Sequence, residues 1–178
     1  VEAGANVNFN FGGCYPMKAA VLKNHAEAVN YLLEKGAKID VKMAVESHLH
    51  IACMHGCLET VLVLAKSKAQ TELRDFKKRT PLISAAASHS ANDERMVKMC
   101  EFLVKRGANI DAVDEKGATA LHHAASRYRP KTVAALLRLG ADATRKDKKG
   151  KTALERARMY HQKNPHYGTE VIKKLESR

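Results

Sequence analysis

Tryptophan is absent from the 178-residue sequence, and aromatic residues make up only 5% of it. Four cysteines, Cys14, Cys53, Cys57 and Cys100, are too few and too irregularly spaced for a disulfide framework in a chain of this length. No run approaches the ~18 to 20 uncharged apolar residues of a membrane span, and the first residues lack the charged and then apolar segments of a signal peptide. These absences predict a soluble chain with reduced thiols, in the cytoplasm or the nucleus.

Positive charge is abundant and unevenly distributed. The chain carries 31 Lys and Arg against 19 Asp and Glu, a net charge of +12. Residues 1–74 hold 8 basic and 7 acidic side chains, whereas residues 75–178 hold 23 and 12. The hydrophobic fraction of 45% is sufficient for one domain with a continuous core. An anionic partner is therefore expected to meet the second half of the chain.

The sequence repeats itself at two kinds of position. A Gly-Ala pair followed by a polar residue recurs at 4–8, 36–40, 107–111 and 140–143, with a degenerate copy at 68–71. Ahead of these pairs, a turn leads into a segment of small residues that begins in turn at Tyr15, Ser47, Thr80, Thr119 and Thr152. Thr80 is suited to cap a helix, Pro81 fits a first helical turn, and the glycines suit helix ends. Each copy therefore predicts a helix pair.

The segments Thr80-Pro81-Leu82-Ile83-Ser84-Ala85 and Thr119-Ala120-Leu121-His122-His123-Ala124, at a spacing near 33 residues, resemble the T-P-L-H-x-A signature of the ankyrin repeat. The resemblance covers essentially the whole chain. It implies an all-α solenoid of stacked helix-turn-helix units with β-hairpin or turn tips. It further implies a single domain, divided into the end of a truncated repeat at 1–8, repeats at 9–40, 41–73, 74–112 and 113–144, and a C-terminal capping repeat at 145–178.

Departures from the repeat pattern carry further predictions. The segment Val1-Glu2-Ala3-Gly4-Ala5 resembles the end of a second helix, which suggests a piece of a longer protein. The third full repeat has about six extra residues, and the polar segment 88–94 places them in the loop between its two helices. The last repeat is stretched at 162–168, and the helix expected at 169–177 has the alternating charge of a terminal cap.

The strongest candidate for a chemical site is the segment 47–57, which holds three histidines and two cysteines and so contains possible zinc ligands. The repeat register opposes that interpretation. His50 takes the place of the turn histidine of the family, Cys53 takes that of a core alanine, and only His55 and Cys57 are expected to face outward. His122-His123 has no nucleophile at a fixed offset, and no phosphate-binding glycine motif is present. We expect no enzyme activity, cofactor, metal or small-molecule substrate.

Binding is therefore the predicted function, along the concave face that the family forms from its tips and first helices. Two zones follow from the register, the first apolar and the second basic with two aromatic residues. The residues expected to bind a partner are Phe11, Met43 and Met54 in the first zone, and Phe76, Lys77, Arg79, Lys116, Arg127, Lys148, Lys149, Lys151 and Tyr160 in the second.

Several partners are compatible with this face. An extended, acidic segment of another protein is favoured, because arrays of this family bind proteins in that groove. Nucleic acid or anionic lipid is the alternative for the basic half, and the low aromatic content would restrict it to phosphate contacts. A basic stripe that is merely solvated is a further interpretation. The array is also compatible with positioning a catalytic domain elsewhere in a longer protein.

Overall fold

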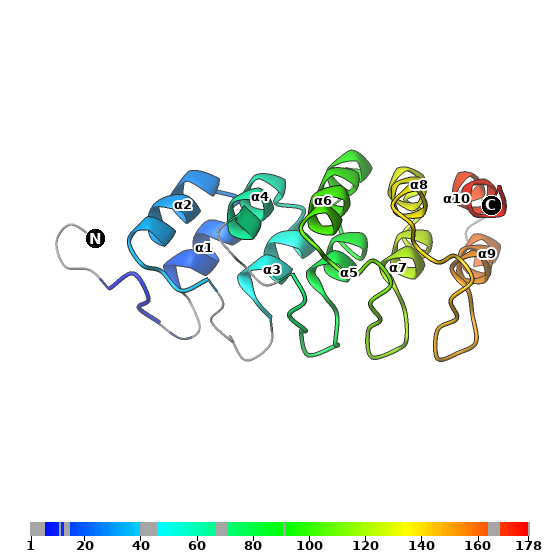
Figure 1. Ribbon diagram of the computed structural model, residues 1–178, viewed down its shortest axis with the longest axis horizontal. Coiled ribbons are helices and arrows are strands. Elements are labelled where there is room, and N and C mark those ends of the chain that lie inside the picture. The colour runs from blue at the N-terminus through cyan, green and yellow to red at the C-terminus, as the bar shows by residue number, and fades with distance from the viewer. Residues whose placement is uncertain are drawn as a thin grey trace.

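The protein is a stack of helix pairs in two parallel rows. The computed structural model describes residues 6–10, 12, 15–39, 46–66, 71–90, 92–163 and 168–177. Within them the first helices are α1 (Pro16–Leu22), α3 (His48–His55), α5 (Pro81–Ala86), α7 (Ala120–Ser126) and α9 (Ala153–Lys163). The second helices are α2 (Ala26–Glu34), α4 (Leu58–Lys66), α6 (Asp93–Lys105), α8 (Pro130–Arg138) and α10 (Thr169–Glu176). The first helices form the lower row in Figure 1, and the second helices form the upper row.

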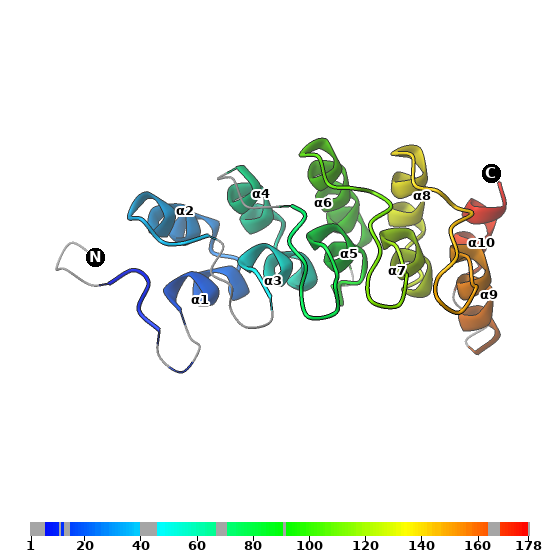
Figure 2. The same cartoon turned by 60° about the horizontal axis from the view of Figure 1, so that its bottom comes forward.

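Hairpin-shaped tips connect successive pairs, and in the described repeats they project from the side of the first helices (Figure 2). Each helix contacts the helices next to it in its own row and its partner in the other row. The stack is therefore held together by contacts between neighbouring repeats, as in other repeat proteins.

The first helices start at the residues that the repeated signature marks. The hydroxyl of Thr80 accepts a hydrogen bond from the N–H of Ile83 at 3.4 Å, and Pro81 occupies the first turn. Ser47 and Thr119 cap α3 and α7 in the same way. In the last repeat Thr152 Oγ1 accepts from the N–H of Glu155. The predicted cap at Thr80 is confirmed, and the other three follow the same pattern, in which a side-chain oxygen satisfies an amide group that a helix start leaves unpaired.

Glycines end three of the second helices, as predicted. Gly36, Gly107 and Gly140 have φ values of +85°, +91° and +97°, a region that glycine enters without a steric penalty. The alanine after each glycine donates its N–H back to the helix, for example from Ala108 to the carbonyl of Leu103 at 3.0 Å. The chain thereby turns toward the next tip.

The core runs along the interface between the two rows. Small side chains, including Ala85, Ala86, Ala124 and Ala125, are fully buried and let adjacent first helices approach closely. Larger apolar side chains of the second helices complete it, among them Val29, Val61, Leu64, Leu103, Val133 and Leu136. Because every pair buries its apolar face against the next pair, the stack is continuous.

The extra residues of the third repeat are only partly in the loop where the sequence placed them. Helix α6 has 13 residues, against nine in α2 and nine in α8, so about one turn of the insertion extends this helix. The helix begins early because the side chain of Asn92 accepts a hydrogen bond from the N–H of Arg95, and Asp93 and Glu94 follow in the first turn.

The remaining part of the insertion is fixed by both neighbouring repeats. Ser88 Oγ donates to the carbonyl of Met54 at 2.8 Å, and Arg129 Nη2 donates to the carbonyls of Ser88 and Ser90. Asp93 accepts hydrogen bonds from the N–H groups of Lys131 and Thr132, at the start of α8. The insertion therefore ties three consecutive repeats together.

Two buried histidines connect a first helix to the tip of the following repeat. His50 Nε2 donates to the carbonyl of Arg79 at 2.8 Å, and His122 Nε2 donates to the carbonyl of Lys151 at 3.0 Å. The Nδ1 atoms lie 2.8 Å from Ser47 Oγ and 2.9 Å from Thr119 Oγ1. Burial lowers the pKa of both imidazoles, although the backbone hydrogen bonds act in the opposite direction. Both rings are therefore neutral in the folded chain at neutral pH.

These histidines predict that stability decreases in mild acid. In the unfolded chain their pKa returns to about 6.5, so the unfolded state binds protons first. The free energy of unfolding is expected to fall as the pH drops from about 7 to about 5. Urea titrations at several pH values measure this. A His50→Asn, His122→Asn variant should lose part of the pH dependence, and an unchanged pH dependence would contradict the assignment.

Candidate partner-binding face

A buried aspartate organises each of the three tips that the structure describes in repeats three to five. Asp75, Asp114 and Asp147 are 6%, 7% and 6% exposed. The Oδ1 atom of each accepts two backbone N–H groups, from the residues two and four positions later, at 2.8 to 2.9 Å. These bonds close the turn and satisfy amide groups that would otherwise be unpaired.

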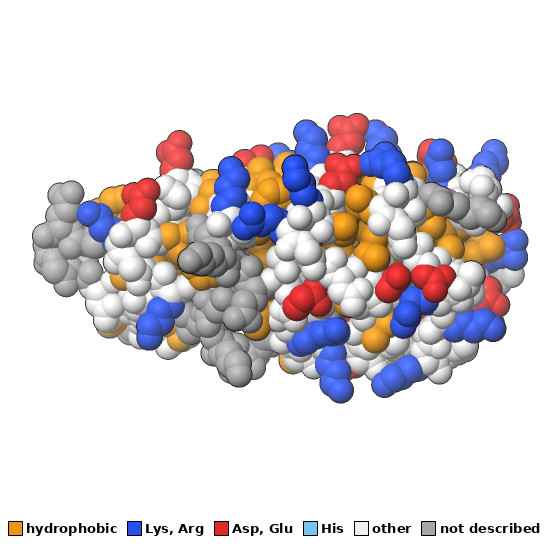
Figure 3. All heavy atoms as spheres, in the orientation of Figure 1, with side chains coloured by type: hydrophobic (Ala, Val, Ile, Leu, Met, Phe, Trp, Pro, Cys, Tyr) orange, Lys and Arg blue, Asp and Glu red, His pale blue; other side chains and the backbone are white. Residues whose placement is uncertain are grey.

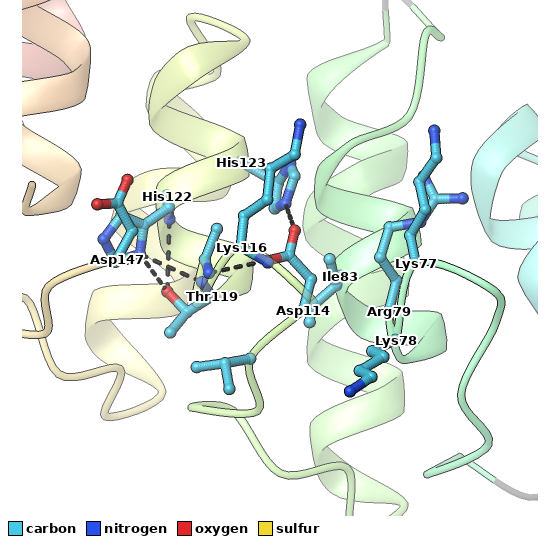
Figure 4. A network of polar contacts seen from close by, with 12 residues as sticks. Lys77, Lys78, Arg79, Ile83, Asp114, Lys116, Thr119, His122, His123 and Asp147 are labelled. Atoms are coloured by element: carbon cyan, nitrogen blue, oxygen red, sulfur yellow. Dashed lines mark hydrogen bonds and ion pairs between the residues drawn. The ribbon is translucent and has the colours of Figure 1, made fainter. Parts of the chain in front are cut away.

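The second oxygen of each aspartate holds a basic side chain. Asp75 Oδ2 accepts from Arg79 Nε at 2.6 Å, and Asp147 Oδ2 accepts from Arg156 Nε at 2.6 Å. Asp114 Oδ2 accepts from His123 Nε2 at 2.9 Å (Figure 4). Burial alone would raise the pKa of the Asp114 carboxyl, but the hydrogen bonds from His123 and the backbone outweigh it and lower the pKa to about 2. All three aspartates therefore serve the fold.

Single backbone hydrogen bonds hold neighbouring tips side by side. The N–H of Glu115 donates to the carbonyl of Lys77, and the N–H of Lys148 donates to the carbonyl of Lys116, each at 2.9 Å. In Figure 4 the side chains of Lys77 and Lys116 extend in the same direction from adjacent tips. The tips thus present lysines in a row, one repeat after another.

This arrangement brings part of the predicted site together. Lys116, Lys148, Lys149, Lys151 and Tyr160 line one groove of about 500 Å³, between the tips of repeats four and five and helix α9. The groove is completed by Glu115, Asp147, Arg156 and Met159. Lys and Arg side chains gather along the lower right edge of the molecule in Figure 3, where Figure 1 places these tips.

The other predicted residues lie outside this groove. Phe76 and Lys77 are exposed on the third tip, with Lys77 Nζ 5.1 Å from the centre of the Phe76 ring. Met54 is half-buried on α3. Arg127 is exposed, and its Nη1 lies 3.2 Å from Nδ1 of His89. Phe11 and Met43, from the apolar zone, fall outside the described residues.

Arg79 has a different role from the one predicted. It is only 9% exposed, and its guanidinium contacts Asp75 and also Glu46, whose Oε1 lies 3.2 Å from Nη2. Because two carboxylates already bind it, its charge is not available to a partner. Sequence reasoning also missed the three aspartates, although each lies five positions before the threonine of its repeat.

Some of the positive charge outside the tips is paired with carboxylates. Lys131 pairs with Glu94, Arg138 with Glu101, and Arg158 on α9 pairs with Glu176 on α10. Within the part of the chain that the structure describes, the ammonium groups of the four groove lysines form no ion pair or hydrogen bond. The tips of repeats four and five therefore carry lysines whose charge is not paired.

The cysteines and histidines of the segment 47–57 form no recognisable chemical site. Cys57 is buried, contrary to the prediction that it faces outward, whereas His55 is exposed. Burial raises the pKa of Cys53, and it raises that of Cys100 to about 12, so both remain thiols. Among the described residues no group of three or more His, Cys, Asp or Glu is placed to hold a metal ion. Cys14 lies outside those residues.

No helix in the described ranges combines the length and the apolar character needed to cross a membrane.

Comparison with known families agrees with this architecture. A family model of ankyrin repeats in three copies matches residues 44–114 and 88–165, and a single-repeat model, "Ankyrin repeat", matches 12–44. Because these matches cover most of the chain, the protein belongs to the ankyrin repeat family. The predicted all-α solenoid is confirmed. Ankyrin repeats are typically protein-interaction modules and are generally not catalytic.

Several curated proteins are similar to part of this chain. The mouse "B-cell lymphoma 3 protein homolog" is 35% identical over 102 residues, which cover 54% of this chain and 21% of that protein. The pig "NF-kappa-B inhibitor alpha" is 32% identical over 98 residues, 54% of this chain and 31% of the relative. The Caenorhabditis elegans "ANK repeat-containing protein nipk-1" is 31% identical over 133 residues, 68% of this chain and 22% of the relative. The chain thus matches about a fifth to a third of each relative.

The structural role of Arg79 predicts a loss of stability when it is removed. An Arg79→Ala variant leaves the buried Asp75 carboxylate without its cation, which is expected to lower the free energy of unfolding by about 3 kcal/mol. A Lys77→Ala variant removes an exposed lysine from the same tip and should change stability by less than about 0.5 kcal/mol. Urea-induced unfolding measures both. Equal effects of the two substitutions would refute the distinction.

The contact between tips predicts a difference between two glycines in the same conformation. Gly117 and Gly150 both have a φ of +71°, but a Cβ atom at Gly117 would lie 3.0 Å from the backbone nitrogen of Lys148, whereas one at Gly150 would meet nothing within 4 Å. Gly150→Ala should lower the free energy of unfolding by about 1 kcal/mol through backbone strain alone. Gly117→Ala should lower it by about 1 kcal/mol more. Indistinguishable unfolding curves of the two variants would show that the neighbouring tip moves aside at no cost in stability.

Proposed function

We propose that the chain is a non-catalytic scaffold that binds a negatively charged segment of another protein along the face made by its tips and first helices. The observation that carries this proposal is the row of uncompensated lysines on consecutive tips. Clustered ammonium groups create a local positive potential that attracts carboxylates and speeds their encounter. We also propose that the protein acts in the cytoplasm or the nucleus.

Three features support a binding role for the basic stripe over simple solvation. Lysines recur at the same position of successive tips, since Lys77, Lys116 and Lys149 each stand two residues after the buried aspartate. The stripe borders a groove, whereas a solvated surface needs none. The lysines of the groove form no ion pair among the described residues, whereas Lys131 and Arg138 on α8 each pair with a glutamate.

The relatives agree with a role in protein binding. The name of NF-kappa-B inhibitor alpha states that it inhibits NF-kappa-B. Only 31% of that relative is similar to this chain. For the present chain we carry over only the class of function, which is the recognition of another protein by a stack of repeats.

Binding to an acidic peptide library and to a generic oligonucleotide, from ~50 to 300 mM salt, tests the proposal. The wild type should retain selected acidic peptides at the upper salt concentration. A Lys148→Glu, Lys149→Glu, Lys151→Glu variant should lose at least ~10-fold in affinity, because three attractive contacts become repulsive.

A matched control reverses the same number of charges elsewhere. Lys98, Lys105 and Lys173 are exposed on α6 and α10. Their replacement by Glu should leave peptide binding within about twofold, since these lysines do not line the groove and salt screens exposed charges. An equal loss of peptide affinity in both variants would show that only the net charge of the protein matters. Tight oligonucleotide binding with a steep salt dependence would favour a nucleic-acid partner, and no effect of the first variant would leave the stripe as a solvated surface.

A further inference from the structure

The groove between the last two tips combines charge with an apolar floor. Met159 and Tyr160 lie on α9, next to each other in the sequence, and are 48% and 44% exposed. Both line the groove of about 500 Å³, together with the lysines of the two tips. Exposed methionine adds nothing to electrostatic attraction, but its flexible side chain can pack against apolar ligand groups of different shape.

The charges inside the groove separate into a compensated and an available set. The Asp147 carboxylate is saturated by the backbone N–H groups of its turn and by Arg156, so this pair contributes little net field. Glu115 remains as the acidic member of the lining. Lys116, Lys148, Lys149 and Lys151 line the same groove as Met159 and Tyr160, and their ammonium groups form no hydrogen bond or ion pair among the described residues.

A groove that combines apolar side chains with lysines favours a ligand that has both an apolar group and negative charges. Carboxylates satisfy the rim, but they leave Met159 and Tyr160 exposed to water. A single-stranded nucleic acid satisfies the rim with phosphates, yet it gains most from aromatic platforms, and the groove offers Tyr160 alone. An aliphatic or aromatic side chain flanked by carboxylates fits both parts.

We propose that this groove recognises an acidic peptide segment through one apolar anchor residue, which packs on Met159 and Tyr160 while carboxylates on either side of it meet the lysines. This inference rests on the proposed function and adds a specificity rule to it. Phe76 and Lys77, which contact each other on the third tip, lie outside this groove and take no part in the proposed recognition.

Two peptides of equal length and equal negative charge test the rule, one with a central leucine and the other with a central serine. Binding is measured by fluorescence anisotropy at about 150 mM salt, where long-range attraction is screened. The leucine peptide is expected to bind ~10-fold more tightly, because one buried apolar side chain contributes about that factor. A Met159→Ser, Tyr160→Ser variant should bind both peptides equally and with the weaker affinity.

The control variant Tyr31→Ser removes a side chain of the same type and similar exposure, 41%, from α2 at the other end of the stack. It should keep the full preference for the leucine peptide. Binding of both peptides with equal affinity by the wild type would overturn the anchor rule and leave the proposed acidic-segment scaffold standing. Failure to bind either peptide, with the Lys148, Lys149 and Lys151 reversal equally inert, would overturn both.

Discussion

The buried aspartate in the tips of repeats three to five is the residue on which the geometry of the basic face depends. Its Oδ1 accepts the N–H of the residue two positions later, as Asp114 does from Lys116 at 2.8 Å. That residue gives its backbone to the turn and keeps its side chain in solvent, so Lys77, Lys116 and Lys149 are all exposed. A surface property is thereby determined by a buried carboxylate. Without the aspartate, each turn would lose the hydrogen bond that fixes the backbone of this lysine.

The links between repeats are not uniform along the stack. His50 and His122 each bind a carbonyl of the next tip, but Ile83 stands at the equivalent position of the third repeat, and its side chain has no hydrogen-bonding group. There the connection uses arginines instead. Arg74 donates to the carbonyl of Val113, and Arg129 reaches back to the carbonyls of the insertion. Because stability in a repeat array is roughly a sum over neighbours, different bonds serve the same function at successive interfaces.

Local signals made most of the fold predictable, and tertiary contacts account for what was missed. A threonine before a helix and a glycine after one act within a few residues, so Thr80 and Gly107 could be interpreted directly. Asn92, Asp93 and Glu94 also form a helix-start signal, and with more weight they would have placed the early beginning of α6. Asp75 lies only four positions before Arg79, but the second carboxylate that binds Arg79, that of Glu46, lies 33 positions away and gives no local signal. The groove likewise depends on how two tips and α9 meet.

Conformational strain and charge meet at the third tip. Lys78 has a φ of +57°, the region that the other two tips assign to Gly117 and Gly150. For a lysine this conformation costs roughly 1 kcal/mol, and a glycine would relieve it. Two features nevertheless hold the turn in place: the N–H of Lys78 donates to the carbonyl of Asp75, and its own carbonyl accepts from Arg74. The residue adds one more exposed cation to the tip at the expense of local stability. Lys78 is therefore a position where a charged side chain is retained although glycine would adopt the same conformation at a lower cost.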